Sequence, residues 1–312
     1  PKTPEAFTPI KVETPARPAG QEDVIQLVTP KIDTVRVGFI GLGNMATAII
    51  GGLLREDTAL SSEDGNVTVI TAANIIGSAK TEATRQKRAE QFGIAVTASN
   101  REVAEAADVL VLAVKPQFFS EVIAEIRDAV SANTLVISIA AGLTLERIAG
   151  LFDRNVTAMR LIRCRPNTPA LINAGCTAVV PGPGATEADE ALCLRLMESF
   201  GRAIVIPERL MDAASATAGS SPAFVFMFIE ALADGAVAAG MPRAQAYEFA
   251  AAAVAGSAQL VLETGRHPGD LKDMVCSPGG TTIEGVRALE EGSFRASVMN
   301  AISACVEKAK AL

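Results

Sequence analysis

The chain has 312 residues, a formal net charge of −7 and only 4% aromatic residues. Its length is about twice that of the commonest single-core domain, so we expect two domains. The acidic charge argues against a nucleic acid or an anionic membrane as partner and favours a small-molecule substrate. Because rings are scarce, Ala, Val, Leu and Ile must fill the core, which favours packed helices and parallel strands.

The cysteines and the single histidine, His267, form no metal-binding pattern. They are scattered, at Cys164, Cys176, Cys193, Cys276 and Cys305, with no CxxC pair. An odd, scattered set indicates reduced thiols, which predicts a cytoplasmic protein. We expect no metal, and a Ser/His/Asp hydrolase is disfavoured unless His267 is its base.

Residues 1–33 contain six prolines and mixed charges and are expected to form an extension. This segment lacks the features of a targeting peptide. From residue 34 the pattern alternates between strands and helices. Strands are predicted at 35–41, 67–73, 108–114, 134–140, 156–162, 176–182 and 203–207, and the early helices at 44–55, 79–92 and 116–130. The alternation predicts an α/β fold with a doubly wound, mostly parallel sheet, a Rossmann-like domain over residues 34–206.

Residues 207–312 are Ala-rich and helical in period, which predicts an all-α second domain. Pro222 and Pro242 occupy first-turn positions, and Gly219, Gly240 and Gly265 are expected helix ends. The uncharged stretch 249–262 is too short to span a bilayer, which needs roughly 20 residues. The apolar stretch 222–240 carries Glu230 and Asp234. We expect buried helices that pack against another copy of the chain, and no membrane span.

The segment "GLGNMA" fits the dinucleotide-binding pattern G-x-G-x-x-G/A, with Gly41, Gly43 and Ala46 at the three key positions. The first glycine permits the tight turn, the second lets the backbone approach a pyrophosphate, and Ala46 allows close helix packing. The intervening residues that we assign to the cofactor site are Leu42, Asn44 and Met45. An ordinary strand-to-helix turn is the alternative, disfavoured because the motif opens a series of βα units.

The second strand is predicted to end at Asn74, which we assign to the cofactor site, and no Asp or Glu ends this strand to bind a ribose hydroxyl. Ser78, Lys80 and Arg85 could instead contact a phosphate, so NADPH is expected, with NADH possible. Lys87 and Arg88 could equally form a solvated helix face.

The residues at the ends of two later strands are expected to face the cofactor. They are Ala113, Val114, Lys115 and Pro116 in "AVKPQ", and the small residues Ala140 and Ala141 in "IAAG". Pro116 could equally just begin the next helix.

Four motifs together resemble the Δ1-pyrroline-5-carboxylate reductase family: "FIGLGNMATAI", "LAVKPQ", "RCRPNTPA" and "HPGDLKDMVCSPGGTTIEGVRALEEGSFRASVMNAI". The resemblance runs from about Val35 to the C-terminus and implies a dinucleotide domain followed by a helical dimerisation domain, with further assembly in many members. The sequence departs from the family pattern at Arg165, where Met is usual, and at Ser221 and Phe224.

The resemblance implies hydride transfer from NAD(P)H to the C=N bond of a cyclic imino acid, which yields proline. It places the hydroxyl of Thr282 near the substrate nitrogen and the backbone of "SPGGTT" around the carboxylate. The substrate residues are then Ser277, Gly279, Gly280, Thr281 and Thr282, and the glycines suit an anion-binding nest. The alternative is that this loop merely turns the chain and caps a helix.

Five further side chains have two interpretations each. His267 is expected to be structural, held at a helix end, rather than a proton donor. Arg163 and Arg165 could reach a substrate carboxylate or brace the domain junction. Asn100 and Glu208 align with cofactor contacts of the family, but by chemistry alone they suit a helix cap and a solvated first-turn acid.

Two other functions remain open from the sequence. A β-hydroxyacid dehydrogenase shares the glycine turn, but enzymes of that type resemble one another in a catalytic lysine, and no lysine lies between Lys115 and Lys272. A non-catalytic NADP(H)-sensing protein is the second alternative, and turnover would exclude it.

Overall fold

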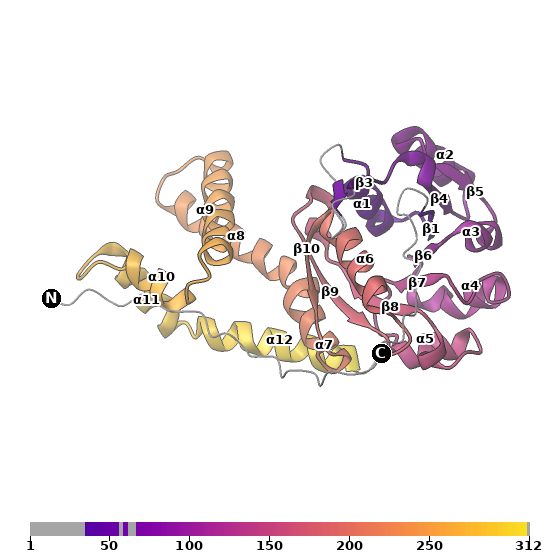
Figure 1. The fold of residues 1–312 in the computed structure, drawn as a ribbon. Helices are drawn as coiled ribbons and strands as arrows, with labels where there is room; N and C mark the ends of the chain where they lie inside the picture. The colour runs from indigo at the N-terminus through magenta and orange to yellow at the C-terminus, as the bar shows by residue number, and fades with distance from the viewer. Residues whose placement is uncertain (1–34, 56–58, 62–66, 311–312) are drawn as a thin grey trace. The chain divides into compact units, whose positions relative to one another are not determined.

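The structure is a computed structural model that describes residues 35–55, 59–61 and 67–310. The predicted extension 1–33 lies outside these residues. An eight-stranded sheet with the order β10-β9-β8-β7-β6-β1-β4-β5 forms the first part of the chain (Figure 1). Its strands are β1 (Val37–Ile40), β4 (Ile75–Ser78), β5 (Ala95–Thr97), β6 (Val109–Leu112), β7 (Leu135–Ser138), β8 (Leu161–Arg165), β9 (Gly175–Pro181) and β10 (Gly201–Val205).

Strands β5-β4-β1-β6-β7-β8 have the doubly wound order 3-2-1-4-5-6 and are all parallel. Strand β9 pairs antiparallel with β8, and β10 pairs parallel with β9. The carboxyl ends of β1, β6, β7 and β8 therefore lie at one edge of the sheet. The predicted α/β fold with a mostly parallel sheet is confirmed.

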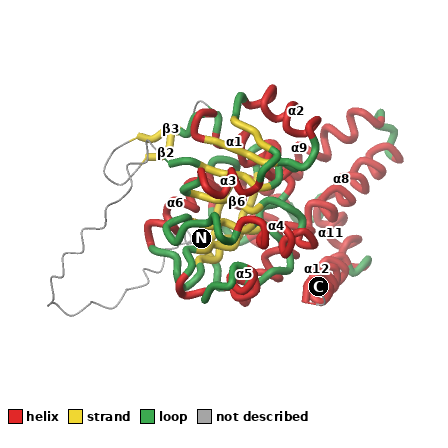
Figure 2. The backbone as a smooth tube through the Cα atoms, turned by 90° about the vertical axis from the view of Figure 1, so that its right-hand side faces the viewer, coloured by secondary structure: helices red, strands yellow, loops and turns green. Residues whose placement is uncertain are grey.

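The central strands are buried on both faces, which explains their nearly all-apolar sequences VGFI, VLVL and LVIS. Helices cover both faces of the sheet, as Figure 2 shows. They are α1 (Asn44–Leu53), α2 (Glu82–Phe92), α3 (Asn100–Ala106), α4 (Phe119–Ile126), α5 (Leu145–Leu151) and α6 (Glu187–Glu198). One apolar cluster joins the sheet to α1 and α6, and a second joins it to α3, α4 and α5.

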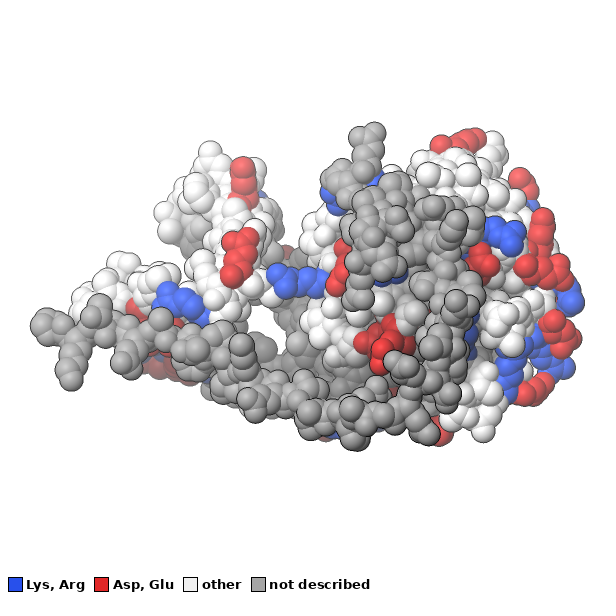
Figure 3. Space-filling view, viewed as in Figure 1, with Lys and Arg blue, Asp and Glu red and all other residues white. Residues whose placement is uncertain are grey.

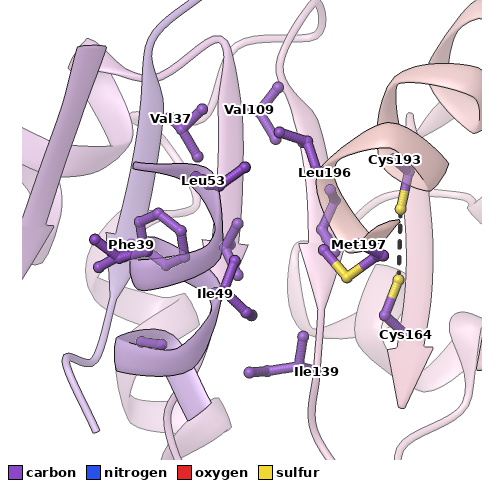
Figure 4. Packing of buried hydrophobic residues seen from close by; sticks show 14 of the residues in the cluster. Val37, Phe39, Ile49, Leu53, Val109, Ile139, Cys164, Cys193, Leu196 and Met197 are labelled. Atoms are coloured by element: carbon purple, nitrogen blue, oxygen red, sulfur yellow. Dashed lines mark hydrogen bonds between the residues drawn. The ribbon is translucent and has the colours of Figure 1, made fainter. Parts of the chain in front are cut away.

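In the first cluster, Phe39 of β1 lies against Ile49 of α1 (Figure 4). The thiols of Cys164 in β8 and Cys193 in α6 lie 3.4 Å apart in the same cluster. Hydrogen bonding to Cys193, together with burial, raises the pKa of the Cys164 thiol well above its usual value. All five cysteines are free.

The prediction of the second strand is wrong. Residues 67–69 form β3 (Val67–Val69), which pairs antiparallel with β2 (Ala59–Ser61) in a separate ribbon. The second strand of the main sheet is β4, which follows a short 3₁₀ turn, Ala72–Asn74. The strand predicted at 156–162 is also displaced, because Val156–Ala158 form a 3₁₀ turn and β8 begins at Leu161.

The second part of the chain is helical, as expected. It contains a 3₁₀ turn (Glu208–Leu210), α7 (Met211–Ala214), a π-helical segment (Ser215–Ser220), α8 (Ser221–Ala238), α9 (Arg243–Thr264), α10 (Pro268–Val275), α11 (Thr281–Glu291) and α12 (Phe294–Lys310). Gly265 ends α9 in the left-handed region, with a φ of 62°, as predicted. Gly219 does not end a helix, because the chain stays helical from Met211 through Ala238.

Helices α8 and α9 pack against each other through Ala233, Ala246 and Ala250. Most of their other apolar side chains are exposed in the single chain, so the prediction that these helices are buried does not hold within one chain. Among the described residues, one helical stretch, Glu208–Ala238, is long and apolar enough to cross a membrane by length and composition. This is weak evidence for a span, because a helix that packs against a second subunit has the same composition.

Candidate active site

The glycine turn has the geometry that a pyrophosphate needs. Gly41 has a φ of +94°, and a Cβ at this position would lie 2.9 Å from a methyl group of Val114. Its amide donates to the carbonyl of Ser78 at 3.0 Å, which ties the turn to the end of β4. A Cβ on Gly43 would meet nothing within 4 Å, so the space above the start of α1 is open. Free amides at a helix N-terminus facing open space suit a phosphate.

The residues between and after the glycines fix the turn in place. Leu42 and Ala46 are buried against the sheet, whereas Asn44 is exposed and Met45 is half-buried at the start of α1. The burial of Ala46 agrees with the prediction that a small side chain is needed there for close helix packing.

A cavity of about 360 Å³ lies beside the turn and is lined by Gly41, Ser78, Lys80, Asn100 and Val114. The hydroxyl of Ser78 donates to Oδ1 of Asn100 at 2.7 Å, and Nδ2 of Asn100 donates to Glu125 at 2.7 Å. The structure thus brings together five residues that the sequence analysis assigned to the cofactor or its phosphate. Six further lining residues were not predicted, because no sequence pattern marks them as cofactor contacts. They are Ala79, Ala98, Phe118, Glu121, Val122 and Glu125.

Two of the predicted assignments need correction. Asn74 precedes β4 and lies beside Arg36 at the amino end of the strands, opposite the glycine turn. Its side chain accepts from the amide and hydroxyl of Thr71. The cap of α3 is Ser99, not Asn100, whose side chain is directed to Ser78 instead. Since β4 ends at Ser78, the observation that no acid ends the second strand still stands.

The cations near this cavity are not equivalent. The Arg85 guanidinium donates to the carbonyls of Ala79 and Lys80 and pairs with Glu82, so it braces the loop after β4. Arg88 donates to the carbonyl of Leu42 at 3.3 Å and is not a purely solvated residue. Lys80 lines the cavity and is exposed, which leaves it available to a phosphate.

The other predicted strand-end residues lie at the same edge of the sheet as Gly41. Ala113 and Val114 follow β6, with Lys115 exposed beyond them, and Pro116 begins a 3₁₀ turn, as the alternative interpretation held. After β7, Ala140 is buried and Ala141 is half-buried. Small side chains here leave room for a flat ring.

Glu208 is not the solvated acid that its chemistry alone suggested. Its Oε1 accepts from the amide of Leu145 at 2.8 Å and pairs with Nη1 of Arg163 at 3.1 Å. This pair braces the start of α5 and the end of β8 against the first turn after residue 207. Arg163 therefore has the bracing role, which was one of its two interpretations. Arg165 forms no ion pair with the described residues.

The loop 277–282 is mostly exposed. Residues 277–280 precede α11, and Thr281 and Thr282 are the first two residues of this helix. Gly279 has a φ of +66°, and Gly280 precedes the first helical residue with no side chain capping it. A side chain at Gly280 would collide with the hydroxyl of Ser277. The first amides of α11, near Thr281 and Thr282, are therefore free to bind an anion. In the described part of the chain, no hydrogen bond or ion pair joins this loop to the sheet.

His267 has a structural role, but not the predicted one. It caps the start of α10, where Nδ1 accepts from the amide of Gly269 at 3.0 Å. The prediction placed it at the C-terminal end of a helix. Within the described residues, no group of three or more His, Cys, Asp or Glu side chains could hold a metal ion.

A doubly wound sheet with this glycine turn defines a dinucleotide-dependent oxidoreductase. Residues 36–142 match the family model described as NADP oxidoreductase coenzyme F420-dependent. Residues 208–312 match the model described as pyrroline-5-carboxylate reductase dimerisation.

Similarity to individual proteins gives the same result over nearly the whole chain. The pyrroline-5-carboxylate reductase of Escherichia coli K12 is 50% identical over 277 residues, which cover 89% of this chain and 98% of that relative. The one from Arabidopsis thaliana is 38% identical over 90% of this chain and 96% of that relative. The chain therefore belongs to the pyrroline-5-carboxylate reductase family, as the motifs had indicated.

Solved structures agree. A pyrroline-5-carboxylate reductase from Coxiella burnetii has a TM-score of 0.79 at 32% identity, covering 89% of this chain and 98% of that one. The Plasmodium falciparum pyrroline carboxylate reductase, solved with NADP bound, has a TM-score of 0.73 at 29% identity over the same shares. The β-hydroxyacid dehydrogenase alternative is not favoured.

Proposed function

We propose that this protein reduces 1-pyrroline-5-carboxylate to L-proline with NADPH, the last step of proline biosynthesis. The observation that carries the proposal is the presence, in one chain of this family, of the open glycine turn and the "SPGGTT" loop. NADPH, when bound, supplies the hydride. The protein must then hold the cofactor and substrate, orient their reacting faces and manage one proton.

The cofactor-binding residues lie at the carboxyl edge of the sheet. Residues 41–46 bind the pyrophosphate through backbone amides and the N-terminus of α1. Ser78, Asn100 and Lys80 hold the adenosine end, and the small residues after β6 and β7 accommodate the nicotinamide. The preference for NADPH over NADH rests on Lys80 and on the lack of an acid after Ser78. Glu208 acts on this site through Arg163 and Leu145.

The substrate-binding residues come from the loop 277–282. The amides at the start of α11 hold the carboxylate, because the positive φ of Gly279 and the absence of a Cβ on Gly280 allow the backbone to fold around an anion. The hydroxyl of Thr282 lies at the ring nitrogen and positions its proton.

The loop and the glycine turn meet across a subunit interface. We place the domain boundary at residue 207, so that residues 34–206 form the dinucleotide domain and residues 207–312 the dimerisation and substrate domain. Two chains pair through the exposed apolar helices, and the pairs assemble further into a larger homo-oligomer. The scattered, reduced cysteines are consistent with a cytoplasmic enzyme.

Turnover is the decisive experiment. Purified protein mixed with NADPH and 1-pyrroline-5-carboxylate should oxidise the cofactor, measured as loss of nicotinamide absorbance. Steady-state rates with NADH in parallel measure the cofactor preference. Tight NADPH binding without turnover would support the sensor alternative instead.

The role of Thr282 is tested by Thr282→Ala. We expect kcat to fall by roughly 10²-fold, within the range of positioned proton-transfer groups, while the Kd for NADPH changes less than about twofold. Thr264→Ala is the matched control, since it removes an exposed threonine hydroxyl that donates to the carbonyl of Leu260 in its own helix, α9. A kcat equal to that of wild type in the Thr282→Ala variant would show that this hydroxyl takes no part in the reaction.

A further inference from the structure

A second cavity, of about 370 Å³, lies at the same edge of the sheet as the predicted nicotinamide position. It is lined by Ala141 and Gly142 after β7, by Arg163 and Arg165 at the end of β8, and by residues of α12 that include Lys308. The π-helical segment 215–220 forms another wall. It is tied to the loop after β8 by Asn167, whose Nδ2 donates to the carbonyl of Ala218 at 2.9 Å.

The strand geometry aims both arginines into this cavity. Side chains two residues apart on a strand lie on the same face, so Arg163 and Arg165 share one face while Cys164 faces the core and Cys193. Both arginines line the cavity, and the Arg163 side chain is only 6% exposed.

The cations of the cavity outnumber its acids. Glu208 satisfies one nitrogen of Arg163 but also accepts from the amide of Leu145. The Nε atoms of Arg163 and Arg165 are both buried without a hydrogen-bond partner in the described part of the chain. Lys308 adds a third positive charge at the exposed side, and Asp212 is the only acid among the described residues that line the cavity. No ion pair joins Asp212 to either arginine among the described residues.

The half-buried Arg165 lines the same cavity as the buried Arg163 and, unlike Arg163, has no ion-pair partner among the described residues. Burial and, to a smaller extent, repulsion from Arg163 lower the pKa of Arg165 from its usual value. The side chain still stays protonated, because an arginine does not lose its proton in proteins. An anion between them would supply the missing acceptor atoms and offset the repulsion. The planar fork of a guanidinium matches the two oxygens of a carboxylate.

We propose that Arg165, backed by Arg163, forms a carboxylate-binding subsite in this cavity. The role of the subsite in the reaction rests on the proposed function, whereas its ability to bind a carboxylate does not. Its carboxylate comes from one of two sources. The first is the reacting imino acid, whose single carboxylate the subsite would then share with the loop 277–282 of the second subunit, and the other is a second small carboxylate that binds beside it. The family pattern has Met at the position of Arg165, so the subsite is a property of this chain rather than of the fold.

The first experiment measures steady-state kinetics for Arg165→Met, Arg165→Lys and the control Arg127→Met. Arg127 is an exposed arginine that pairs with Asp153 away from this cavity. If the reacting molecule fills the subsite, Arg165→Met raises the KM for the imino acid about tenfold or more, as expected for loss of a charge-assisted pair. The KM for NADPH and kcat should stay within about twofold of wild type, and Arg165→Lys should recover part of the loss.

The second experiment uses acetate as a bare carboxylate probe, with sodium chloride at equal ionic strength as its control. If a second carboxylate fills the subsite, Arg165→Met leaves the KM unchanged but raises the inhibition constant for acetate about tenfold. A variant that matches wild type in both KM and acetate inhibition overturns the proposal. So does an Arg127→Met variant that shows the same losses.

Folding and activity are controlled separately. Should Arg165→Met fail to fold, Lys308→Met removes an exposed cation of the same cavity, and a smaller rise, of about threefold, is expected in the same constant. Calorimetric titration of acetate into the protein without NADPH tests the subsite alone. Acetate binding that depends on Arg165, in a protein without reductase activity, would refute the proposed function and support the subsite. Reductase activity without acetate binding and without an effect of Arg165→Met on KM would refute the subsite and support the proposed function.

Discussion

The sheet domain and the helical domain bury their apolar residues in different ways. In the sheet domain, strands and helices of one chain close over two apolar clusters, and Phe39, Ile123 and Leu110 are fully buried. Among the described residues from 221 onward, the buried apolar residues are only Ala233, Ala246, Ala250 and Leu271. The first region completes its core within one chain, whereas the second needs another surface to cover it.

The surfaces differ accordingly. In the view of Figure 3, mixed acidic and basic side chains crowd the visible helices of the sheet domain, while large parts of α8 and α9 carry no charge. Phe226 is 64% exposed, Phe249 67% and Met299 69%. Exposure of several large apolar side chains on these helices is typical of a surface that another subunit covers. We therefore expect substitutions in the sheet domain to lower the free energy of unfolding, and substitutions on the exposed helices to weaken assembly.

The largest effect is expected in the sheet core. Phe39→Ala removes a ring that packs between β1 and α1, and we expect a loss of about 3–5 kcal/mol in the free energy of unfolding. Urea unfolding of the full-length protein, at a concentration low enough to keep it monomeric, measures this loss. Phe226→Ala is the matched control under these conditions, since the same truncation at an exposed ring creates no cavity within the chain. An equal loss of unfolding free energy in both variants would show that the two regions do not differ in how they bury apolar side chains.

A smaller effect on folding but a clear one on assembly is expected for Phe226→Asp. A charge placed on the exposed apolar face of α8 would be buried without a partner when two chains pair. We expect the dimer dissociation constant to rise at least about tenfold, measured by sedimentation across a range of protein concentrations. The secondary structure should be retained. An unchanged dimer would mean that this face of α8 is not the interface.

The smallest effect concerns an ion pair inside the sheet domain. Arg160 pairs with Asp189, whose side chain is 1% exposed and also accepts from the amide of Thr186. Burial by itself would raise the pKa of Asp189, but hydrogen bonds from Arg160 and from Thr186 outweigh burial and lower it. We expect Asp189→Asn to cost about 2 kcal/mol at pH 7.

The sign of the pH dependence follows from the lowered pKa. The ionised carboxylate stabilises the folded state above the unfolded pKa of about 4, and this contribution is lost as the pH falls through the lower folded value. Denaturant titrations from pH 7 to pH 2 should therefore show the wild type losing its advantage over Asp189→Asn below about pH 4. A difference that stays constant with pH would show that this carboxylate does not titrate between these values.

Much of the sheet was predictable, and the failures have physical reasons. Strands β1, β6 and β7 are buried on both faces, so their sequences are continuous apolar runs. Strand β4, Ile75–Ser78, is short, and the β-branched residues in 67–73 gave a stronger strand pattern. Of these residues, only Val67–Val69 form a strand, and it belongs to a separate two-stranded ribbon. The same error placed Asn74 at the wrong edge.

The residues of the candidate active site also divide into those that local sequence predicts and those that only the fold reveals. The glycine turn is local, so its residues and their φ angles followed from a six-residue pattern. Glu125, which holds Asn100, and the pairing of Glu208 with Arg163 depend on residues 25 and 45 positions apart. No periodicity in the chain marks such contacts.

The sequence by itself determined the doubly wound class, the turn that suits a dinucleotide and the family to which the chain belongs. These properties reside in local patterns, where backbone sterics and side-chain burial act over a few residues. Only the tertiary structure decided which strand stands second in the sheet, that Asn74 lies opposite the turn, and that Arg163 and Arg165 share one cavity. Those outcomes depend on which distant segments pack together, and packing free energy is a property of the whole fold.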